Sequence, residues 1–208
     1  MIEFENPMLA VDVVTVRFRD NHLQLALGHR LFEPNKGELA LAGVLMRAGE
    51  TVADAACRAV TSKLGIDGNH IRHIKYGKVF DTPTRDSRGP TISLGCIAVI
   101  EPDANGTATW VGFEEIPKLP FDHNVIVDQI KAWMLESIWM DPPLLAALLG
   151  DPFPTTAMVA LDSDLAGEPP TPSNIHRKLG AVGFLTSTQR PPIGRGRPQT
   201  WWRTRAGE

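Results

Sequence analysis

The stretch that decides the fold is GVLMRAGETVADAACRAVTSKLGI, residues Gly43–Ile66. Within it, Thr51 is followed three residues later by Asp54, an arrangement close to the capping box that opens many helices. Apolar residues then recur at helical spacing, namely Ala55, Ala56, Val60 and Leu64. Gly65 stands where such a helix must end. The stretch therefore predicts a strand that leads through a loop into a helix.

The same stretch resembles the signature of Nudix hydrolases, Gly-x5-Glu-x7-Arg-Glu-apolar-x-Glu-Glu-x-Gly-apolar, a strand–loop–helix that cuts diphosphates. The positions that match its spacing are Glu50, Arg58, Val60, Gly65 and Ile66, and Gly43 and Gly49 precede them. Val44 departs from it, because a second glycine is usual there. An ordinary amphipathic helix after a loop is the alternative, and the unbroken spacing from Glu50 to Arg58 favours the Nudix signature.

Three positions that hold glutamate in the signature differ here, and they are Ala59, Ser62 and Lys63. Those acids hold magnesium or manganese, hard cations that require several anionic oxygens. Without them a bound metal cannot polarise a phosphoryl oxygen or activate water. The resemblance therefore implies a degenerate Nudix box that binds its ligand without cleaving it, with no catalytic residue, no metal and no cofactor.

Two downstream segments extend the resemblance. Residues 80–93, FDTPTRDSRGPTIS, are similar to the TP-x-RDPRG…S loop of ADP-ribose pyrophosphatases, and residues 119–123, LPFDH, are similar to the L-x-FDH segment of the same group. With a basic C-terminal tail, these features resemble the NrtR-type Nudix-related transcriptional regulators. That family joins a catalytically inactive Nudix domain to a winged helix-turn-helix domain. Its members typically repress genes of NAD biosynthesis and are released from the operator by ADP-ribose.

This resemblance supplies the expected effector, ADP-ribose or a related nucleotide, and the residues supply candidate contacts. Four cations lie on loops around the box and are candidates for the diphosphate: Arg30, Arg47, Arg85 and Arg88. Phe80 is the candidate stacking face for the adenine. In the family frame Arg58 pairs with Glu50 and holds the box helix to its loop. Simple solvation is the alternative for each of the other arginines.

Elsewhere, alternation of apolar and polar residues predicts strands over residues 9–19, 23–27, 39–41, 71–80 and 91–100. The turn Asp20-Asn21 makes a hairpin of the first two. Connector residues 113–120 contain one short helical turn. Apolar residues at spacings of three and four predict a helix over 123–138 that packs on the sheet.

Prolines after that helix, in residues 140–143, place the domain boundary between a Nudix-like domain, residues 1–141, and a second domain, residues 142–208. A short helix is expected over 144–149, and Thr155 or Thr156 is expected to cap the next one, which runs to about Ala166. Thr171-Pro172-Ser173 opens a further helix, and strands follow over 184–188 and 199–203. The order helix, turn, helix, β-hairpin predicts a winged helix-turn-helix. The fold class is therefore α+β, a Nudix α/β/α sandwich followed by this C-terminal domain.

Charge separates the two parts of the chain. Residues 171–208 hold seven Arg or Lys against one acid, a net charge of +6, whereas residues 1–170 hold 14 bases and 23 acids, a net charge of −9. A basic segment on an acidic body is typical of nucleic-acid binding. A disordered basic tail is the alternative, and apolar residues such as Ile175, Leu179 and Trp202 argue against it.

The expected partner is a double-stranded DNA operator. A recognition helix places its N-terminal residues against base edges in the major groove, where Asn174 can pair with adenine and Arg177 with guanine. A hairpin tip rich in Arg and Gly suits a minor groove or phosphates. The candidate DNA-binding residues are Ser173, Asn174, His176, Arg177, Lys178, Arg190, Arg195 and Arg197. A homodimer is expected because two half-sites raise affinity.

No apolar run approaches the ~18 residues that span a bilayer, and the first residues lack the basic start and apolar core of a signal peptide. Cys57 and Cys96 are the two cysteines, and both are expected to be buried thiols. A cytoplasmic protein without a membrane partner is the expectation. Three functions remain open: a ligand-responsive repressor, a Nudix hydrolase that uses displaced acids such as Glu50 and Glu114 or Glu115, and an adaptor whose Nudix domain only mediates dimerisation.

Overall fold

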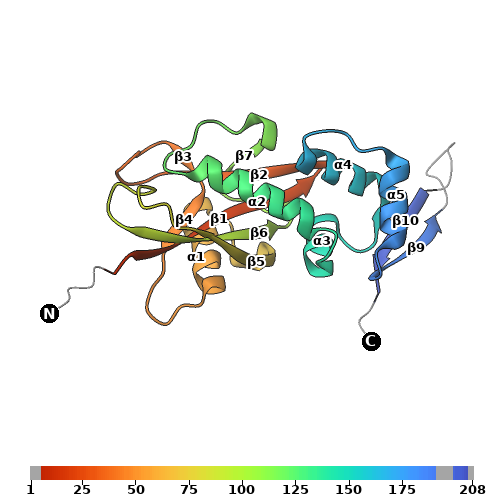
Figure 1. Cartoon of the computed structure of the whole chain (residues 1–208), viewed down its shortest axis with the longest axis horizontal. Coiled ribbons are helices and arrows are strands. Elements are labelled where there is room, and N and C mark those ends of the chain that lie inside the picture. The colour runs from red at the N-terminus through yellow and green to blue at the C-terminus, as the bar shows by residue number, and fades with distance from the viewer. Residues whose placement is uncertain (1–5, 191–198, 206–208) are drawn as a thin grey trace. The chain divides into compact units, whose positions relative to one another are not determined.

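A computed structural model of the chain describes residues 6–190 and 199–205. The chain divides into two compact units, each with many contacts within itself (Figure 1). Unit 1 is Met1–Arg17 with Gln24–Lys131, and unit 2 is Phe18–Leu23 with Ala132–Glu208. The units divide inside a helix, whereas the boundary predicted from the prolines, between residues 141 and 142, follows the end of that helix.

Unit 1 is built on a mixed sheet. Its central strands run parallel to each other, and antiparallel strands flank them, in the order β3-β2-β1-β6-β5, with β4 also on β1 and β7 on β2. In the described chain these strands are β1 (Met8–Arg19), β2 (His22–His29), β3 (Leu39–Ala40), β4 (Ala42–Leu45), β5 (Ile71–Phe80), β6 (Thr91–Ile100) and β7 (Thr109–Gly112). The predicted strands are present. The strand β7 was not predicted, because four half-buried residues carry little alternation.

The hairpin turn between β1 and β2 follows from its two residues. Asp20 and Asn21 both adopt positive φ, 53° and 61°. Such a pair suits the two-residue turn whose twist matches that of the flanking strands, and Asp and Asn tolerate this conformation better than most residues.

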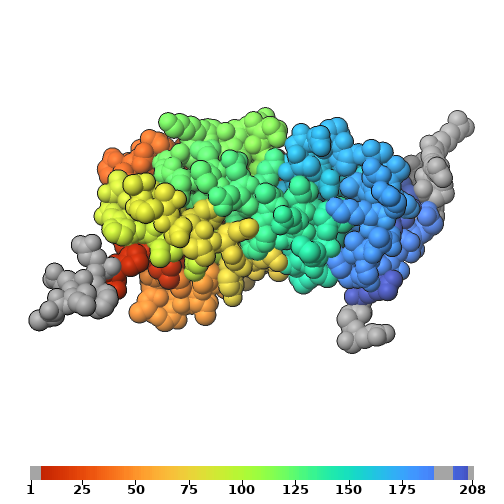
Figure 2. Space-filling view, in the orientation of Figure 1, coloured from red at the N-terminus to blue at the C-terminus, as the bar shows by residue number. Residues whose placement is uncertain are grey.

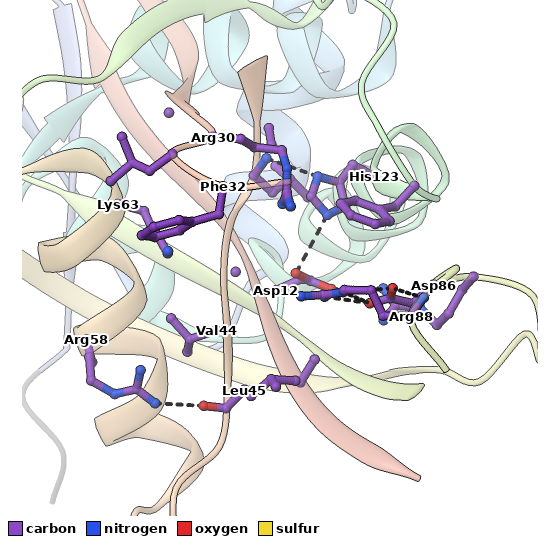
Figure 3. A pocket seen from close by; sticks show the side chains of 18 of the residues that line it. Asp12, Arg30, Phe32, Val44, Leu45, Arg58, Lys63, Asp86, Arg88 and His123 are labelled. Carbon is purple, nitrogen blue, oxygen red and sulfur yellow. Dashed lines mark hydrogen bonds and ion pairs between the residues drawn. The ribbon is translucent and has the colours of Figure 1, made fainter. Parts of the chain in front are cut away.

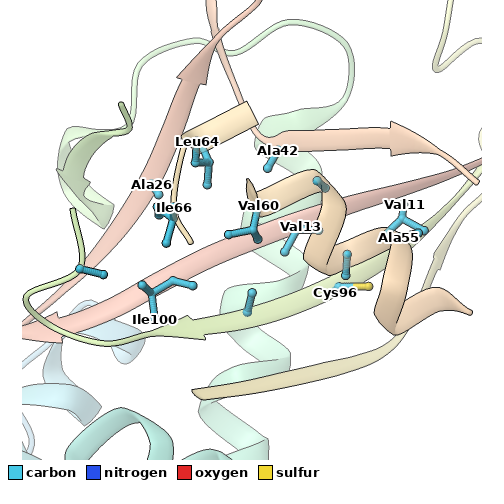
Figure 4. Close-up of a cluster of buried hydrophobic side chains, with 14 residues drawn as sticks. Val11, Val13, Ala26, Ala42, Ala55, Val60, Leu64, Ile66, Cys96 and Ile100 are labelled. Carbon is cyan, nitrogen blue, oxygen red and sulfur yellow. The ribbon is translucent and has the colours of Figure 1, made fainter. Parts of the chain in front are cut away.

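The helix α1 (Val52–Leu64) covers one face of the sheet. Thr51 and Asp54 form the complete capping box, and Gly65 ends the helix with a left-handed φ of 63°. Its apolar face packs with β1 and β6 in one buried cluster, and Figure 4 shows Val60 and Leu64 of the helix within it. Burying a side chain of this size contributes about 1.5–3 kcal/mol.

A residue that replaces a signature glutamate and one of the two cysteines also belong to that cluster. Ala59, which stands where the signature has glutamate, is fully buried in it. Cys96 is buried there as expected, and burial raises the pKa of its thiol to about 12. Cys57 is only half-buried, so the expectation of two buried thiols is right for one of them.

The helix α2 (His123–Ser137) covers the opposite face. Side chains alternate along β1, so that Val11 and Val13 meet α1 while Asp12 faces His123 at the start of α2. Ile126 and Ile130 of α2 are fully buried. Unit 1 therefore has helices on both faces of its sheet, with two short 3-10 helices, η1 (Gly68–His70) and η2 (Phe113–Glu115), at its edges.

Unit 2 contains three helices and a small three-stranded sheet of order β8-β10-β9 within the described residues. Its elements are α3 (Pro142–Leu149), β8 (Phe153–Pro154), α4 (Thr155–Ala166), α5 (Pro172–Ala181), β9 (Leu185–Arg190) and β10 (Gln199–Thr204). The helix α3 begins two residues before the predicted Leu144, because proline is accepted in a first turn and Asp141 caps it. The strand β8 was too short to predict.

Thr155 does not cap α4 as expected. Pro154 holds the N-cap position, and Thr155 already lies in the helix. The Thr155 hydroxyl instead accepts a hydrogen bond from Nε1 of Trp202 at 2.8 Å and donates to the carbonyl of Thr200 at 3.2 Å. It therefore ties α4 to β10.

No helix within residues 6–190 and 199–205 is long and apolar enough to cross a membrane.

Candidate functional site

A pocket of about 460 Å³ opens in unit 1 (Figure 3). Five segments line it: β1, the loop after β2, residues 40–47, the box helix α1, and residues 85–88 with the start of α2. Four of the five predicted effector residues line it, namely Arg30, Arg47, Arg85 and Arg88. Their hydrogen bonds give them different roles.

Arg85 is already committed to carboxylates. Its Nε and Nη2 donate to the two oxygens of Asp122 at 2.9 Å each, and Nη2 also donates to Asp12 at 2.9 Å. Only 4% of the side chain is exposed. A buried guanidinium held by two carboxylates joins the loop after β5 to β1 and α2. These hydrogen bonds give Arg85 a structural role, and its direct binding of phosphate stays a prediction.

Arg30 and Arg88 converge on one aromatic ring. Their guanidinium carbons lie 4.7 and 5.8 Å from the ring centroid of Phe121, whose own φ of 58° is rare for a bulky residue. Arg88 also pairs with Asp86 at 2.6 Å. Burial and the neighbouring Arg88 lower the pKa of Arg30. The two guanidiniums act on each other electrostatically, and an anion bound near both would offset their repulsion.

Phe80 does not line the pocket, contrary to expectation. It is 6% exposed, and its ring packs so closely on Gly95 that a Cβ there would lie 2.6 Å from Cε2. Two other rings line the pocket, those of Phe121 and Phe32. Phe121 lies in the LPFDH segment, which gave a signal for the site without assigning this residue. Phe32 lies on an irregular loop without a pattern, and 71% of it is exposed.

The predicted pair within the box is confirmed. Arg58 donates from Nε and Nη2 to Glu50 at 2.6 and 2.7 Å, and from Nη2 to the carbonyl of Leu45 at 2.9 Å. The hydrogen bond from Arg58 lowers the pKa of Glu50 to about 2. Ser62 donates to the carbonyl of Arg58 at 2.6 Å. Arg58 thus holds the helix to the loop before it.

Lys63 differs from its neighbours in the box. It lines the pocket, and its side chain enters it beside Phe32 in Figure 3. Among the described residues it has no ion-pair partner. The position that carries an acid in the signature therefore presents a cation to the pocket.

Asp12 and His123 form a buried centre. His123 ends the LPFDH segment, to which the sequence gave no residue roles, and no pattern indicated Asp12. Oδ2 of Asp12 accepts hydrogen bonds from Arg85 at 2.9 Å and from the hydroxyl of Ser93 at 2.7 Å. Nδ1 of His123 accepts from the backbone N–H of Leu41 at 3.1 Å. Burial lowers the pKa of His123, which favours the neutral imidazole.

No group of three or more His, Cys, Asp or Glu side chains in residues 6–190 and 199–205 is placed to hold a metal ion. The displaced acids considered for a hydrolase lie elsewhere. Glu114 is 82% exposed and lies 3.6 Å from Lys131, and Glu115 accepts from the N–H of Gly112 at 3.4 Å. Neither lines the pocket, and Glu50 is paired with Arg58.

A second candidate surface is α5 in unit 2, within the blue region of Figure 2. Ile175 and Leu179 are buried, and the five predicted DNA contacts on the helix are exposed: Ser173, Asn174, His176, Arg177 and Lys178. The ring of His176 packs on Trp202 with centroids 5.4 Å apart, and Nζ of Lys178 lies 3.7 Å from the ring centroid of Trp139. These two side chains therefore also hold α5 in place.

The other predicted DNA contacts lie on the β9–β10 hairpin. Arg190 ends β9, and its side chain is not described. Arg195 and Arg197 lie outside the described residues.

Comparison with protein-family models gives no match. The ADP-ribose pyrophosphatase of Methanocaldococcus jannaschii is 31% identical over 135 residues, which are 62% of this chain and 75% of that protein.

Solved structures share the fold over more of the chain. The crystal structure of Shewanella oneidensis NrtR complexed with a 27mer DNA matches with a TM-score of 0.73 and 20% identity, covering 95% of this chain and 93% of that one. The NUDIX domain of the same NrtR, complexed with ADP ribose, matches with a TM-score of 0.52 and 20% identity, covering 62% of this chain and 88% of that one. The resemblance to NrtR-type proteins thus extends to the fold of nearly the whole chain.

Proposed function

We propose that this chain, which belongs to the Nudix family, is a DNA-binding regulator that senses ADP-ribose and does not cleave it. The same family includes the ADP-ribose pyrophosphatase of M. jannaschii. One observation carries this proposal. The pocket presents cations, including Lys63 at a position of the degenerate box, and the described residues hold no cluster of acids for a metal. Such a pocket can bind a diphosphate, but its described residues lack the acids that would hold a metal ion to activate water beside it.

The ligand fits the pocket by charge and by shape. Arg30 and Arg88 lie close enough over Phe121 for both to reach one diphosphate, and Lys63 adds a third positive charge. Guanidinium–phosphate hydrogen bonds are short and charge-assisted. The exposed ring of Phe32 is the stacking face we assign to the adenine. The NrtR NUDIX domain complexed with ADP ribose supports this choice of ligand.

Unit 2 is the proposed DNA reader. Its order of α4, α5, β9 and β10 suits a winged helix-turn-helix, with α5 as recognition helix, and the NrtR complex with DNA supports it. Asn174 and Arg177 are the proposed base contacts, because His176 and Lys178 are engaged with tryptophan rings. Arg190, Arg195 and Arg197 are the proposed phosphate contacts of the hairpin. We further propose a cytoplasmic homodimer that represses genes of NAD metabolism.

The test couples the two ligands. Isothermal calorimetry measures ADP-ribose binding to the full chain, and gel-shift titration measures operator DNA binding with and without saturating ADP-ribose. A sensor released by its effector loses operator affinity by roughly 5- to 150-fold, which corresponds to about 1–3 kcal/mol of coupling. Binding of ADP-ribose that leaves operator affinity unchanged contradicts the sensor. An absence of ADP-ribose binding contradicts the choice of ligand.

A Nudix hydrolase is the second candidate, and the identity of 31% to a pyrophosphatase favours it. The same protein sample, incubated with ADP-ribose and magnesium or manganese, should give no AMP. Binding of ADP-ribose should also be equal in EDTA and in magnesium, since no carboxylates are placed to hold the ion among the described residues. Turnover that Glu50→Gln abolishes would establish the hydrolase instead.

A further inference from the structure

The pocket contains a donor and an acceptor that lack hydrogen-bond partners among residues 6–190 and 199–205. Asp12 and His123 both line the pocket, with 8% and 6% of their side chains exposed. Oδ2 of Asp12 is occupied by Arg85 and Ser93. Oδ1 accepts no hydrogen bond from the described residues and lies 3.7 Å from Nε2 of His123, which is too long for a direct hydrogen bond.

The hydrogen bond from Leu41 fixes which nitrogen of His123 carries the proton. Nδ1 accepts from the backbone N–H of Leu41, so it cannot carry hydrogen in the neutral ring. The proton is then on Nε2, which faces Oδ1 of Asp12. A donor and an acceptor stand side by side at the bottom of a cationic pocket.

Gly43 keeps the space above Oδ1 open. It lies opposite Asp12 in the pairing of β1 with β4, and a Cβ at this position would overlap Oδ1. Glycine is therefore required at position 43 for its lack of a side chain, not for a positive φ.

We propose that Asp12 and His123 bind a sugar hydroxyl of the nucleotide ligand, and this inference rests on the proposed function. A hydroxyl accepts one hydrogen bond and donates another, so a single oxygen can accept from Nε2 and donate to Oδ1. Atoms 3.7 Å apart leave room for an oxygen at about 2.8 Å from each. A phosphate oxygen is excluded from this place, because it has no proton to donate and Asp12 would repel it.

Different residues of the pocket thereby bind chemically different groups of the ligand. Arg30 and Arg88 take the diphosphate, and the buried floor takes a neutral hydroxyl. Asp12 and His123 select a sugar-linked diphosphate over inorganic pyrophosphate, which carries no sugar.

Asp12→Asn tests this division in the full chain. The asparagine oxygen can still accept from Arg85 and Ser93, but its NH2 group then faces the N–H of His123, so two donors oppose each other. Calorimetry should show ADP-ribose affinity falling by roughly tenfold to a hundredfold, the worth of one hydrogen bond to a charged group. Pyrophosphate affinity should not fall, because the variant removes a negative charge that repels phosphate oxygens. Asp128→Asn, at an exposed position of α2, makes the same charge change and should alter neither.

Gly43→Ala is the second variant, and it fills the space above Oδ1 without changing any charge. It should reduce ADP-ribose affinity and spare pyrophosphate, whereas Gly183→Ala, where a Cβ meets nothing within 4 Å, should do neither. Equal losses for ADP-ribose and pyrophosphate in both variants would overturn the inference, because Asp12 would then act only by placing Arg85. Unchanged ADP-ribose affinity in both would overturn it as well. A wild-type chain that binds neither ligand would instead refute the proposed function.

Discussion

The helices α1 and α5 each follow a threonine at the N-cap position, yet they bury different numbers of side chains. The helix α1 buries five side chains and closes its first turn with a complete capping box. The helix α5 buries two side chains and has no side-chain hydrogen bond at its N-cap Thr171. The polar residues between Ser173 and Lys178 are exposed. Helices that bury most of one face hold a fold together, while a helix with a narrow apolar stripe leaves its surface for a partner.

The structural roles of the box residues in α1 explain how the signature can lose its acids and keep its fold. The retained box residues act on structure: Arg58 clamps Glu50 and Leu45, and Gly65 ends the helix. The replaced residues are accommodated within the helix, since Ala59 joins the core and Ser62 donates to the backbone carbonyl of Arg58. Among the three residues that replace glutamate, only Lys63 lines the pocket.

The largest expected effect on stability is at Leu64. This side chain of α1 is fully buried, so Leu64→Ala should lower the free energy of unfolding by about 2–5 kcal/mol. Arg177→Ala on the exposed face of α5 should change it by less than about 0.5 kcal/mol. Urea unfolding followed by circular dichroism measures both. Comparable losses at the two positions would contradict the division between a structural helix and an interaction helix.

Local patterns predicted most of the fold. The strands β5 and β6 and the cap of α1 agree with the sequence, because periodicity and cap residues act over a few positions. The two-residue strand β8 escaped, since its pairing with β10 depends on residues far along the chain.

The site was predicted less well, for the same physical reason. The four pocket arginines were found by their place near the box. The burial of Arg85 between Asp12 and Asp122 depends on residues 73 and 37 positions away, which no local pattern reveals. The ring of Phe80 packs on Gly95 of β6 and does not line the pocket, whereas the rings of Phe32 and Phe121 do. Buried polar partners have to be found in three dimensions.

The second prediction concerns DNA binding by α5. If Arg177 reads a base, Arg177→Ala should weaken binding to the operator by about 1–3 kcal/mol and spare a scrambled duplex. Lys178→Ala should weaken both duplexes similarly, because its ammonium lies over Trp139 and supports the helix. Gel-shift titrations at several salt concentrations measure these affinities. Equal binding of both duplexes by the wild-type chain would favour a non-specific basic tail.

The third prediction uses acid to weaken the clamp on α1. Glu50 has its pKa lowered from 4.5 to about 2 by the hydrogen bond from Arg58. Because the folded pKa is the lower one, the clamp stabilises the fold fully above about pH 4.5 and loses this contribution as pH falls toward 2. Glu50→Gln should therefore flatten the decline in unfolding free energy over that range. The exposed Glu114→Gln is the control. A decline as steep in Glu50→Gln as in the wild type would show that other carboxylates cause it.

The smallest expected effect compares the two N-cap threonines directly. The Thr51 hydroxyl accepts from the N–H of Asp54 at 3.2 Å, and the Asp54 carboxylate accepts from the N–H of Thr51 at 3.0 Å. Thr51→Ala removes one side of this reciprocal cap and should lower the free energy of unfolding by about 1 kcal/mol. Thr171 makes no such hydrogen bond, so Thr171→Ala should cost only about a few tenths of a kcal/mol. Paired urea titrations resolve a difference of this size. A larger loss of unfolding free energy at Thr171 would mean that the stability of α5 depends on its cap as much as that of α1 does. The exposed face of α5 would then have a cause other than DNA binding.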